Sequence, residues 1–513
     1  MSSTLLKWAE ETSPDRGKII VVSLASILLY YITTTTLAWY RLRHFPGPPL
    51  AAISNLWNLY SVVGGDCHHI IQRTQDQYGK VVRVGPNTLA VFDPEIVRRI
   101  GSARSSYDRA GWYGSVRFHP EGDSVFSEMN TTRHDKRKAK LIKGFSGKGV
   151  LDHEADIDSQ IAAFVNYIKG RVQSGKADKV DFSKIARWFQ LDLITLIGMG
   201  EVWGDLDDET DHFDFLKSMD LATAFIHSIA MMPLLRNIVF SRLFLHLAAP
   251  RATDKSGMGS SIGMMRSIVK ARINGQSESK EGRPHGGMLD EWIKDGLSAD
   301  ECEWDLAILM PAGTETSITS IRGTLLYILS SPSTYQKLKQ EISDGIKEGR
   351  ISKPITYDEA KELPYLQAVI SEGMRMVPPV INGFAKRVPP GGDTIHEKFV
   401  PEGTEIQVNY ISMMKSTETF GADAAIFRPE RFLECDAATK AHRLKTVELC
   451  FGYGRWLCLG KSIAQIELNK IYVELLREFD FQIFDPEQCW KRKGYTTSVI
   501  DDFNLRIWEN PLV

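Results

Sequence analysis

The feature that most limits the fold of this chain is an apolar run near its start, IIVVSLASILLYYITTTTLAWY, residues 19–40. The run contains no charged residue, and as a helix it would be about 33 Å long, enough to cross the core of a bilayer. It ends in Trp39 and Tyr40, an aromatic pair of the kind found at membrane interfaces. A buried helix or a signal peptide would be the alternatives, but a signal peptide has a shorter apolar core. The run therefore predicts a transmembrane anchor.

This anchor divides the chain into four parts. Residues 1–18 form an N-terminal flank, residues 19–40 the anchor, and residues 41–50 a proline-rich hinge whose HFPGPPL cannot continue a helix. Residues 51–513 then form one large domain, because no later stretch resembles a linker. The polar, glycine-rich stretch 275–288 is interpreted as a surface loop. Basic residues stand on both sides of the anchor, so charge does not settle its orientation.

The composition excludes several classes of protein. Hydrophobic residues make up 43% of the 513 residues and charged residues 25%, which is ordinary for a globular chain. The net charge of −2 gives no basic field for nucleic acid. The six cysteines show no CxxC pair, so a reducing compartment is favoured over a disulfide scaffold.

The periodicity of the large domain is mostly helical. VVRVGPNTLAVFDP, residues 81–94, predicts two strands joined by a Gly-Pro turn, and residues 388–409 predict short strands with turns. Helical periodicity dominates from about 150 to 345 and returns over 461–479. The expected fold class is mainly α with small β-sheets.

One cysteine stands in an unusually constrained loop, FGYGRWLCLGK, residues 451–461. Cys458 lies where a glycine-rich turn meets a predicted helix, and the first N–H groups of a helix stabilise a thiolate. A thiolate needs a metal, a substrate carbonyl or another sulfur as its partner. Heme iron needs only one protein ligand of this kind. Glycines 452, 454 and 460 would let the backbone lie against a planar ring.

The loop resembles FxxGxRxCxG, the heme-ligand loop of the cytochrome P-450 superfamily of heme-thiolate monooxygenases. Phe451, Gly454, Cys458 and Gly460 are in register, and the GRWLCLGK form is similar to the branch of fungal enzymes that includes pisatin demethylase. The resemblance implies heme b (iron protoporphyrin IX) with Cys458 as axial ligand. Gly452 and the neighbouring loop residues would also contact the heme. Where the family has an arginine two residues before the cysteine, this chain has Trp456, with Arg455 one position earlier. Either side chain could contact a heme propionate.

A second motif lies in the apolar helical run AILMPAGTETSITSI. An ionisable Glu315 inside such a run is costly unless it is paired or hydrated, and a polar stripe on an amphipathic helix is the alternative reading. The segment AGTETS, residues 312–317, resembles the family's oxygen-binding groove. That resemblance places Ala312 and Gly313 against the heme. It implies that Thr316 and Glu315 deliver protons during oxygen activation.

A third set of residues has a structural role by the same resemblance. Glu372 and Arg375 are spaced i, i+3 in EGMR and lie on one face of a helix. Such pairs are commonly solvated, but in the family the pair joins an arginine from a downstream segment. That segment is FRPERF, residues 427–432, which assigns Arg431 as the third member. The triad is expected to hold the core that positions the cysteine loop.

Further heme contacts are expected from two basic segments. In RHDKRKAKLIK, residues 133–143, His134 and Lys138 are in register with the family's propionate-binding helix, and a solvated helix face is the alternative. In AKRVPPGG, Arg387 resembles a propionate-binding arginine, and a surface arginine is the alternative. The remaining lysines of residues 133–143 could dock an acidic reductase surface.

The family layout also implies the surroundings of the reaction. The substrate site would be hydrophobic and lined by residues 111–113, 225–232, 312, 380–382 and 497–499. Electrons would come from an NADPH-dependent flavoprotein reductase, because the chain has no GxGxxG fingerprint or flavin domain of its own. One atom of O2 would enter a small molecule of fungal secondary metabolism. The anchor would lie in the endoplasmic reticulum membrane as a single pass, with the catalytic domain in the cytosol.

Two other functions fit parts of this pattern. A heme-thiolate isomerase or dehydratase would use no reductase, but such relatives typically lose the groove residues that Glu315 and Thr316 retain. A non-catalytic heme-binding membrane protein would have no need of an oxygen groove. Turnover that depends on NADPH and a reductase distinguishes the monooxygenase from both.

Overall fold

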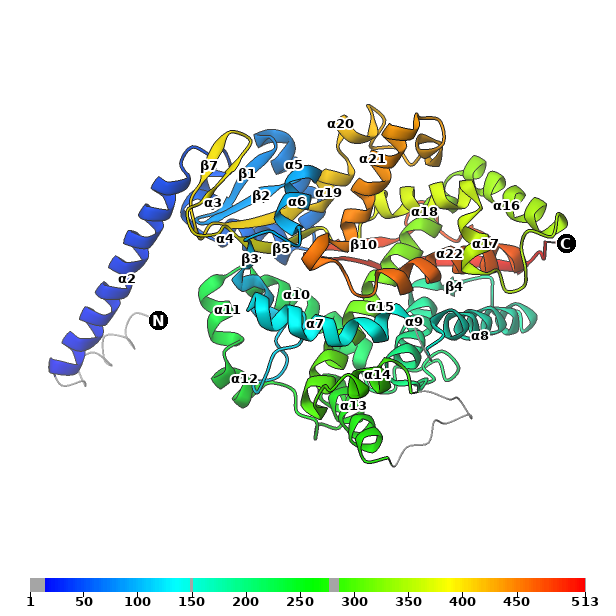
Figure 1. Ribbon diagram of the computed structural model, residues 1–513, viewed down its shortest axis with the longest axis horizontal. Helices are drawn as coiled ribbons and strands as arrows, with labels where there is room; N and C mark the ends of the chain where they lie inside the picture. Colours follow the sequence, from blue (N-terminus) through cyan, green and yellow to red (C-terminus); the bar gives the residue numbers. More distant parts are fainter. Residues whose placement is uncertain (1–13, 148–150, 276–285, 513) are drawn as a thin grey trace.

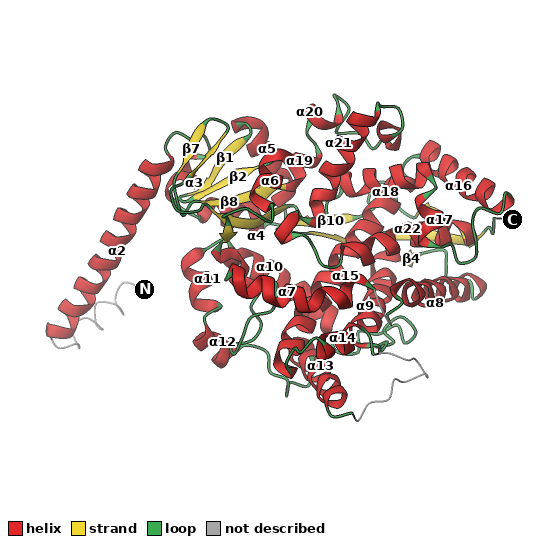
Figure 2. Cartoon of the chain, in the orientation of Figure 1, coloured by secondary structure: helices red, strands yellow, loops and turns green. Residues whose placement is uncertain are grey.

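The computed structural model describes residues 14–147, 151–275 and 286–512. Its fold is mainly helical with small sheets, as the periodicity predicts (Figure 2). A β-rich part lies beside the N-terminal helix, and the larger helical part extends away from it to the C-terminus (Figure 1). Most of the glycine-rich stretch predicted as a surface loop, residues 276–285, lies outside the described residues.

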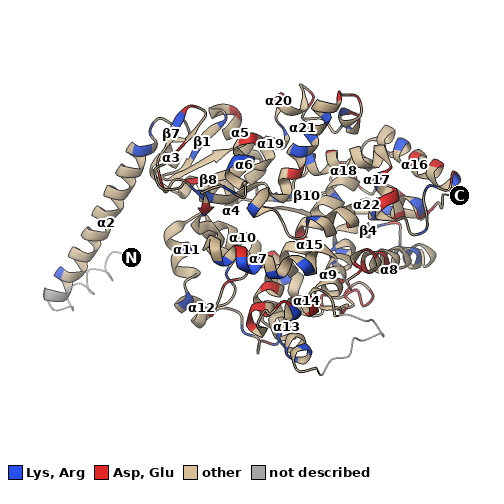
Figure 3. Cartoon of the chain, in the orientation of Figure 1, with Lys and Arg blue, Asp and Glu red and all other residues tan. Residues whose placement is uncertain are grey.

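The first helix stands apart from the body of the protein. Helix α2 (Pro14–Leu42) contains an apolar stretch, Gly17–Leu42, that is long enough to cross a membrane and whose most apolar window has none of its residues buried. Figure 3 shows little charge along it except near its two ends. This matches the predicted anchor over residues 19–40 in length and composition.

The end of this helix is attached to the β-rich part. Leu42 and Phe45 are buried in a hydrophobic cluster with residues of the sheet. The Arg83 guanidinium donates hydrogen bonds to the carbonyls of Ala38, at 3.1 Å, and Trp39, at 3.3 Å. The segment predicted as a hinge, residues 41–50, therefore has defined packing, and its prolines lead into the next helix at Pro49.

The principal sheet has five strands in the order β1-β2-β8-β5-β3. The turn at Gly85-Pro86 joins β1 and β2 as antiparallel partners, which confirms the predicted strand pair. β2 and β8 are parallel, and β5 pairs with β8 across an irregularity between Gly383 and Lys386. The smaller sheets are β4-β12-β9, β10-β11 and β6-β7.

The strands have these bounds: β1 Val81–Gly85, β2 Thr88–Val91, β3 Asp108–Arg109, β4 Val180–Asp181, β5 Asn382–Arg387, β6 Asp393–Ile395, β7 Lys398–Val400, β8 Glu405–Asn409, β9 Phe479–Ile483, β10 Lys491–Gly494, β11 Ser498–Asp501 and β12 Asn504–Glu509.

The helices of the first half have these bounds: α3 Pro49–Ile53, α4 Leu56–Val63, α5 Cys67–Tyr78, α6 Pro94–Gly101, the 3₁₀ helix η1 Gly111–Val116, α7 Thr131–Ser146, α8 His153–Gln173, α9 Phe182–Met199, α10 Phe215–Ala230, α11 Pro233–Val239, α12 Arg242–Ala248 and α13 Gly257–Ile273. Those of the second half are α14 Met288–Lys294, α15 Ala299–Leu329, α16 Pro332–Lys347, α17 Tyr357–Lys361, α18 Pro364–Met376, α19 Tyr410–Met414, α20 Thr417–Phe420, η3 Pro429–Phe432, α21 Ala437–Val447, η4 Glu448–Phe451, η5 Gly454–Trp456 and α22 Lys461–Glu478.

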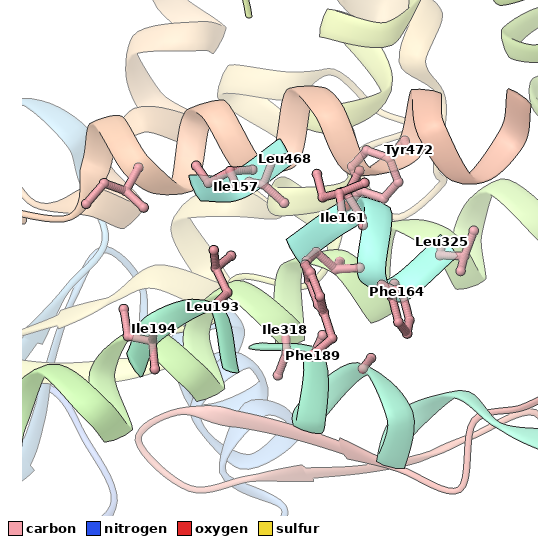
Figure 4. Close-up of a cluster of buried hydrophobic side chains, with 14 of the residues drawn as sticks. Ile157, Ile161, Phe164, Phe189, Leu193, Ile194, Ile318, Leu325, Leu468 and Tyr472 are labelled. Atoms are coloured by element: carbon pink, nitrogen blue, oxygen red, sulfur yellow. The ribbon is translucent and has the colours of Figure 1, made fainter. Parts of the chain in front are cut away.

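The long helix α15 runs through the centre of the helical part. It begins at a capping box, in which the Ser298 hydroxyl accepts from Glu301 N–H and the Glu301 carboxylate accepts from Ser298 N–H. Aliphatic and aromatic side chains of α8, α9, α15 and α22 meet in one buried cluster (Figure 4). Burial of this apolar surface fixes α15 against α22, the helix that follows the cysteine loop.

Candidate functional site

A cavity of about 420 Å³ lies beside the middle of α15. The cysteine loop, α7, α9, α10, η1, β5 and the β10–β11 hairpin complete its walls. Most of its lining is aliphatic or aromatic. The lining residues with chemical groups that bear on function are Arg109, Trp112, His134, Lys138, His227, Glu315, Thr316, Lys386, Trp456, Cys458 and Glu467.

The cysteine loop is folded by its own backbone. Cys458 N–H donates to the Phe451 carbonyl at 2.7 Å, and Gly452 N–H to the Leu449 carbonyl at 2.8 Å. Gly452 has a φ of +76°, and a Cβ there would lie 2.5 Å from the Trp456 carbonyl oxygen. A side chain at this position would therefore break the turn that presents Cys458.

Cys458 lines the cavity and keeps solvent-accessible surface. Burial raises the pKa of Cys458, while the backbone N–H groups of Gly460 and Lys461 and the charge of Lys138 act in the opposite direction. The Lys138 ammonium also donates to the Arg455 and Leu457 carbonyls, at 2.8 and 2.9 Å. These groups would stabilise Cys458 as a thiolate when a metal cation binds to it.

The residues of the predicted oxygen groove also reach the cavity. Ala312, Gly313, Glu315 and Thr316 all line it. The Thr316 hydroxyl donates to the Ala312 carbonyl one turn earlier, at 2.7 Å. This bond fixes the rotamer of Thr316 and leaves its oxygen lone pairs available.

Glu315 belongs to an ionic cluster that reaches toward the surface. Arg187 donates to Glu315 Oε1 at 2.7 Å and binds both carboxylate oxygens of Asp220 at 2.8 and 3.0 Å. Glu315 Oε2 is buried and has no partner within the described structure. One oxygen of Glu315 is thus neutralised, and the other remains free to accept a proton or a hydrogen bond.

One end of the cavity is strongly basic. Arg109, Lys138 and Lys386 line it together with His134 and Trp456. Burial, and then the charge of Arg109, lowers the pKa of Lys386 well below its usual value and that of His134 to about 4. Burial and the same arginine also lower the pKa of Lys138. We call these five residues the basic end of the cavity.

Some hydrogen-bond donors at the basic end of the cavity have acceptors, and others have none in the described structure. Arg109 donates to the carbonyls of Val125, Phe126 and Glu128, yet its Nε has no acceptor within the described structure. The indole Nε1 of Trp456 is also buried without a partner among those residues. Unpaired buried donors beside several cations suit a ligand that carries carboxylates.

The structure distinguishes the two residues that the sequence left open before the cysteine. Trp456 lines the cavity, with its ring centroid 5.0 Å from that of His134. Arg455 instead donates to the carbonyls of Ala103 and Ser105 and pairs with Asp135 at 3.2 Å. Arg455 therefore attaches the loop to the segment after α6, outside the cavity lining.

The structure places Arg387 and its neighbour Lys386 in different surroundings. Arg387 is exposed and lies outside the cavity lining, whereas the neighbouring Lys386 is buried and lines it. The cause is the irregularity in β5, where Gly383 and Phe384 have φ values of +112° and +48°. This bulge changes which side chains of the strand face inward.

Arg109 is a second residue that the sequence did not single out. It lies in a two-residue strand immediately before the loop that was predicted to touch substrate. The one feature of the sequence that could have indicated Arg109 is its position shortly before the aromatic pair Trp112-Tyr113. A single arginine near aromatic residues is too common to identify a binding site. Only the packing of β3 on β5 brings it to the basic end.

The predicted triad is assembled away from the cavity lining. Arg375 makes a bidentate pair with Glu372, with both contacts at 2.7 Å, and Arg431 Nε contacts the same carboxylate at 2.9 Å. All three side chains are fully buried. The two guanidinium groups also donate to the carbonyls of Met414, Phe420, Ala424 and Ile426. The triad thus joins α18 to the segment that precedes the cysteine loop.

The predicted substrate-lining segments contribute unevenly. Trp112, Tyr113, Ile226, His227, Val380, Thr497 and Val499 line the cavity, and Phe225 points outward, 55% exposed. The segment around α10 therefore presents alternate faces to the cavity and to the exterior.

These residues fit a heme. The donor set contains one thiol in a constrained loop before a helix, apolar walls, and a basic end with unpaired N–H groups on Trp456 and Arg109. Cys458 is suited to the iron, and the basic end is suited to the two propionates.

Known proteins resemble the chain over most of its length. The cytochrome P450 family profile matches residues 46–499. Cytochrome P450 monooxygenase ABA1 of Pyricularia oryzae is 37% identical over 499 residues, which cover 95% of this chain and 96% of that protein. Cytochrome P450 monooxygenase aba1 of Botryotinia fuckeliana is 38% identical over 450 residues, 87% of each chain. Pisatin demethylase of Fusarium vanettenii is 27% identical over 485 residues, covering 92% and 91%.

Proposed function

The chain belongs to the cytochrome P450 family, and on that premise we propose that it is a membrane-anchored monooxygenase acting on a hydrophobic small molecule. As a P450 monooxygenase it is an oxidoreductase of a family that uses a heme-thiolate cofactor. The observation that carries the proposal is the Cys458 thiol, which shares an apolar cavity with Thr316 and with the basic end.

Heme b would be held by residues from several elements. Cys458 would supply the thiolate to the iron, and the turn at Gly452 positions its side chain for this. Trp456, Arg109 and Lys386 would donate to the propionates, with His134 and Lys138 beside them. Lys138 has a second task, because it also stabilises the loop carbonyls on either side of Trp456. Ala312 would allow close approach of the ring to α15. A Cβ on Gly313 would lie 2.5 Å from Ile194 of α9, so this glycine lets α9 pack closely against α15 beside the cavity.

When bound, the heme supplies the redox chemistry that activates O2. Thr316 holds a hydroxyl at the cavity surface in a fixed rotamer, so that its oxygen can accept a hydrogen bond from a reacting group. Glu315 carries the proton supply. Its Oε2 is buried without a partner in the described structure, and Arg187 links its other oxygen to the half-exposed Asp220. Because Arg187 stays charged, a proton must reach Glu315 through water or through motion of this cluster.

The surroundings support a small, apolar substrate and an external source of electrons. The aliphatic and aromatic walls around Ile226, Val380 and Val499 exclude water and favour a hydrocarbon surface. The relative pisatin demethylase is named for removing a methyl group from pisatin. By analogy, the substrate belongs to fungal secondary metabolism, and insertion of one oxygen atom is the reaction.

The P450 family generally draws its electrons from a reductase. We infer an NADPH-dependent flavoprotein here, docked by basic residues of α7, which carries blue segments in Figure 3. Lys136 is an exposed lysine of this helix. The apolar helix α2 would hold the protein in the endoplasmic reticulum membrane as a single pass, with the body in the cytosol.

The experiment that tests this function is the reduced, carbon-monoxide-bound difference spectrum of the expressed protein. The expected result is a Soret band at the long wavelength of thiolate-ligated heme, lost in Cys458→Ala. Cys450→Ala is the matched control, because Cys450 also lines the cavity but lies before the turn. A thiolate band that survives in Cys458→Ala, or a folded protein without heme, would refute the assignment.

A further inference from the structure

One wall of the cavity is formed by α10, which presents four side chains to it. Met219, Thr223, Ile226 and His227 line the cavity at positions i, i+4, i+7 and i+8, one face of the helix. Two of these residues are apolar. The two polar ones, Thr223 and His227, differ in whether their hydrogen-bonding groups are already used.

The hydroxyl of Thr223 has a hydrogen-bond partner within its own helix, whereas Nδ1 of His227 has none in the described structure. The Thr223 hydroxyl donates to the Met219 carbonyl at 2.7 Å. His227 Nδ1 is buried, and no partner for it exists among residues 14–147, 151–275 and 286–512. A buried polar atom without a partner costs about 1–3 kcal/mol, so histidine is a poor wall residue unless a ligand bonds to it.

The surroundings of His227 determine its own charge, and therefore whether it would bind a charged or an uncharged group. Burial alone lowers the pKa of His227 to about 4, and no charged side chain contributes to that shift. The ring is therefore neutral near pH 7 and offers one donor and one acceptor. Its nearest aromatic neighbour is Tyr495, with ring centroids 6.2 Å apart. Such a site suits an uncharged oxygen better than a carboxylate.

A second unpaired donor lies in η1, which packs against α10. Trp112 Nε1 is buried without a partner in the described chain, and its ring packs against Phe384, with centroids 5.2 Å apart. This part of the cavity therefore combines an aromatic wall with two weakly polar, unpaired groups. Tyr113 connects this part to the basic end, because its ring centroid lies 5.4 Å from that of Trp112 and its hydroxyl accepts from Lys386.

We propose that His227 is a specificity-determining residue that hydrogen-bonds a hydroxyl or carbonyl oxygen of the substrate. This inference rests on the proposed function. It narrows the substrate to a mainly hydrocarbon molecule that already carries one uncharged oxygen before it enters the site. That oxygen must be present before this step, either retained from the precursor or introduced by an earlier oxygenation or hydration.

The test uses four ligands with the same carbon ring: cyclododecane, cyclododecanol, cyclododecanone and cyclododecanecarboxylate. Dissociation constants are measured for the full-length holoprotein by the Soret shift and, independently, by calorimetry. The wild type is expected to bind the alcohol or the ketone about tenfold more tightly than cyclododecane, the size of one net hydrogen bond. His227→Phe should lose this preference, and His227→Gln should keep part of it.

Thr223→Val is the matched control, since its hydroxyl is already engaged, and it should retain the tenfold preference. Equal binding of cyclododecane and both oxygenated rings by the wild type would overturn the proposal. So would tightest binding of the carboxylate, or a preference that survives in His227→Phe but disappears in Trp112→Phe. The reduced carbon-monoxide spectrum of each sample separates this failure from failure of the heme assignment, because calorimetry reports the preference independently of the iron ligand.

Discussion

At the scale of single residues, two neighbours in β5 differ most clearly in burial and in access to the cavity. Lys386 and Arg387 are adjacent basic residues, but only Lys386 is buried at the cavity, where Tyr113 Oη accepts its hydrogen bond at 2.5 Å. A buried cation without a carboxylate is costly, and a bound propionate removes that cost. Heme affinity should therefore depend on one of these residues and not on the other.

We expect Lys386→Met to bind heme at least about tenfold more weakly than the wild type, the loss of one charge-assisted hydrogen bond. Arg387→Met should be indistinguishable from the wild type. The measurement is the rate of heme transfer to an excess of a high-affinity heme acceptor, with the heme-to-protein ratio after purification as a second readout. Faster transfer from Arg387→Met than from Lys386→Met would show that the side-chain orientation of β5 is wrong.

Glu467 gives a residue-scale prediction about pH. This carboxyl group is fully buried on α22, its Oε1 has no partner in the described structure, and Gln190 reaches its other oxygen at 3.4 Å. Burial raises the pKa of Glu467 from 4.5 to about 7. The folded state thus holds the proton over a range where the unfolded state has lost it, and stability falls as pH rises from about 4.5 to about 7.

Glu467→Gln removes this titration. Between pH 5 and pH 8 the wild-type free energy of unfolding should fall by about 2–3 kcal/mol more than that of the variant. Urea unfolding midpoints of both proteins at the two pH values measure the difference, in which the other titrating groups cancel. Parallel pH dependence of the two proteins would contradict the raised pKa of Glu467.

At the scale of elements, the triad links α18 to the chain before the cysteine loop. Glu372 serves both arginines, and its Oε1 also accepts from Arg428 N–H at 2.8 Å. Removal of one partner from a buried ion pair leaves uncompensated charge and costs about 3–5 kcal/mol. For most domains this is a large part of the total stability.

Glu372→Gln should therefore yield little soluble, heme-loaded protein at 37 °C. Glu430→Gln is the control from the same PERF segment, because Glu430 is partly exposed and bonds to Lys337 and Tyr365. It should lose less than about 1 kcal/mol. Heme content and near-ultraviolet circular dichroism report the outcome. If Glu372→Gln folded as well as Glu430→Gln, the triad would not be a major source of stability.

The same scale explains what the sequence could and could not predict. Short motifs with fixed spacing placed Cys458, Thr316 and Glu372 on the correct kind of element, because helix and turn signals are local. The inward face of β5 depended on a bulge at Gly383, which alternation of side chains cannot reveal. The role of Arg109 depended on pairing between β3 and β5, strands that are distant in the sequence. Contacts between segments distant in the sequence therefore limited how much of the site could be predicted.

At the scale of the whole molecule, the anchor and the body form a continuous structure. The sequence predicts a stiff, proline-rich hinge over residues 41–50. Within it Leu42 and Phe45 are buried against residues of the sheet, and Arg83 donates to the Ala38 and Trp39 carbonyls near the end of α2. Arg83 also donates to the Pro86 carbonyl at 2.7 Å, so the body alone partly satisfies it. The direction of the anchor is thus set by packing, and the body keeps its own core.

This arrangement predicts where the chain can be shortened. A chain that begins at Arg41 keeps Leu42 and Phe45 but loses the Ala38 and Trp39 carbonyls, whereas one that begins at Leu37 keeps both acceptors. Both should fold and give the thiolate heme spectrum, and the longer one should be more stable by about 1–2 kcal/mol, because its Arg83 remains paired. Alkaline carbonate should extract both from microsomes and leave the full-length protein in the pellet. Extraction of the full-length protein would refute a membrane-spanning α2, and equal stability of the two shortened chains would refute the role of Arg83.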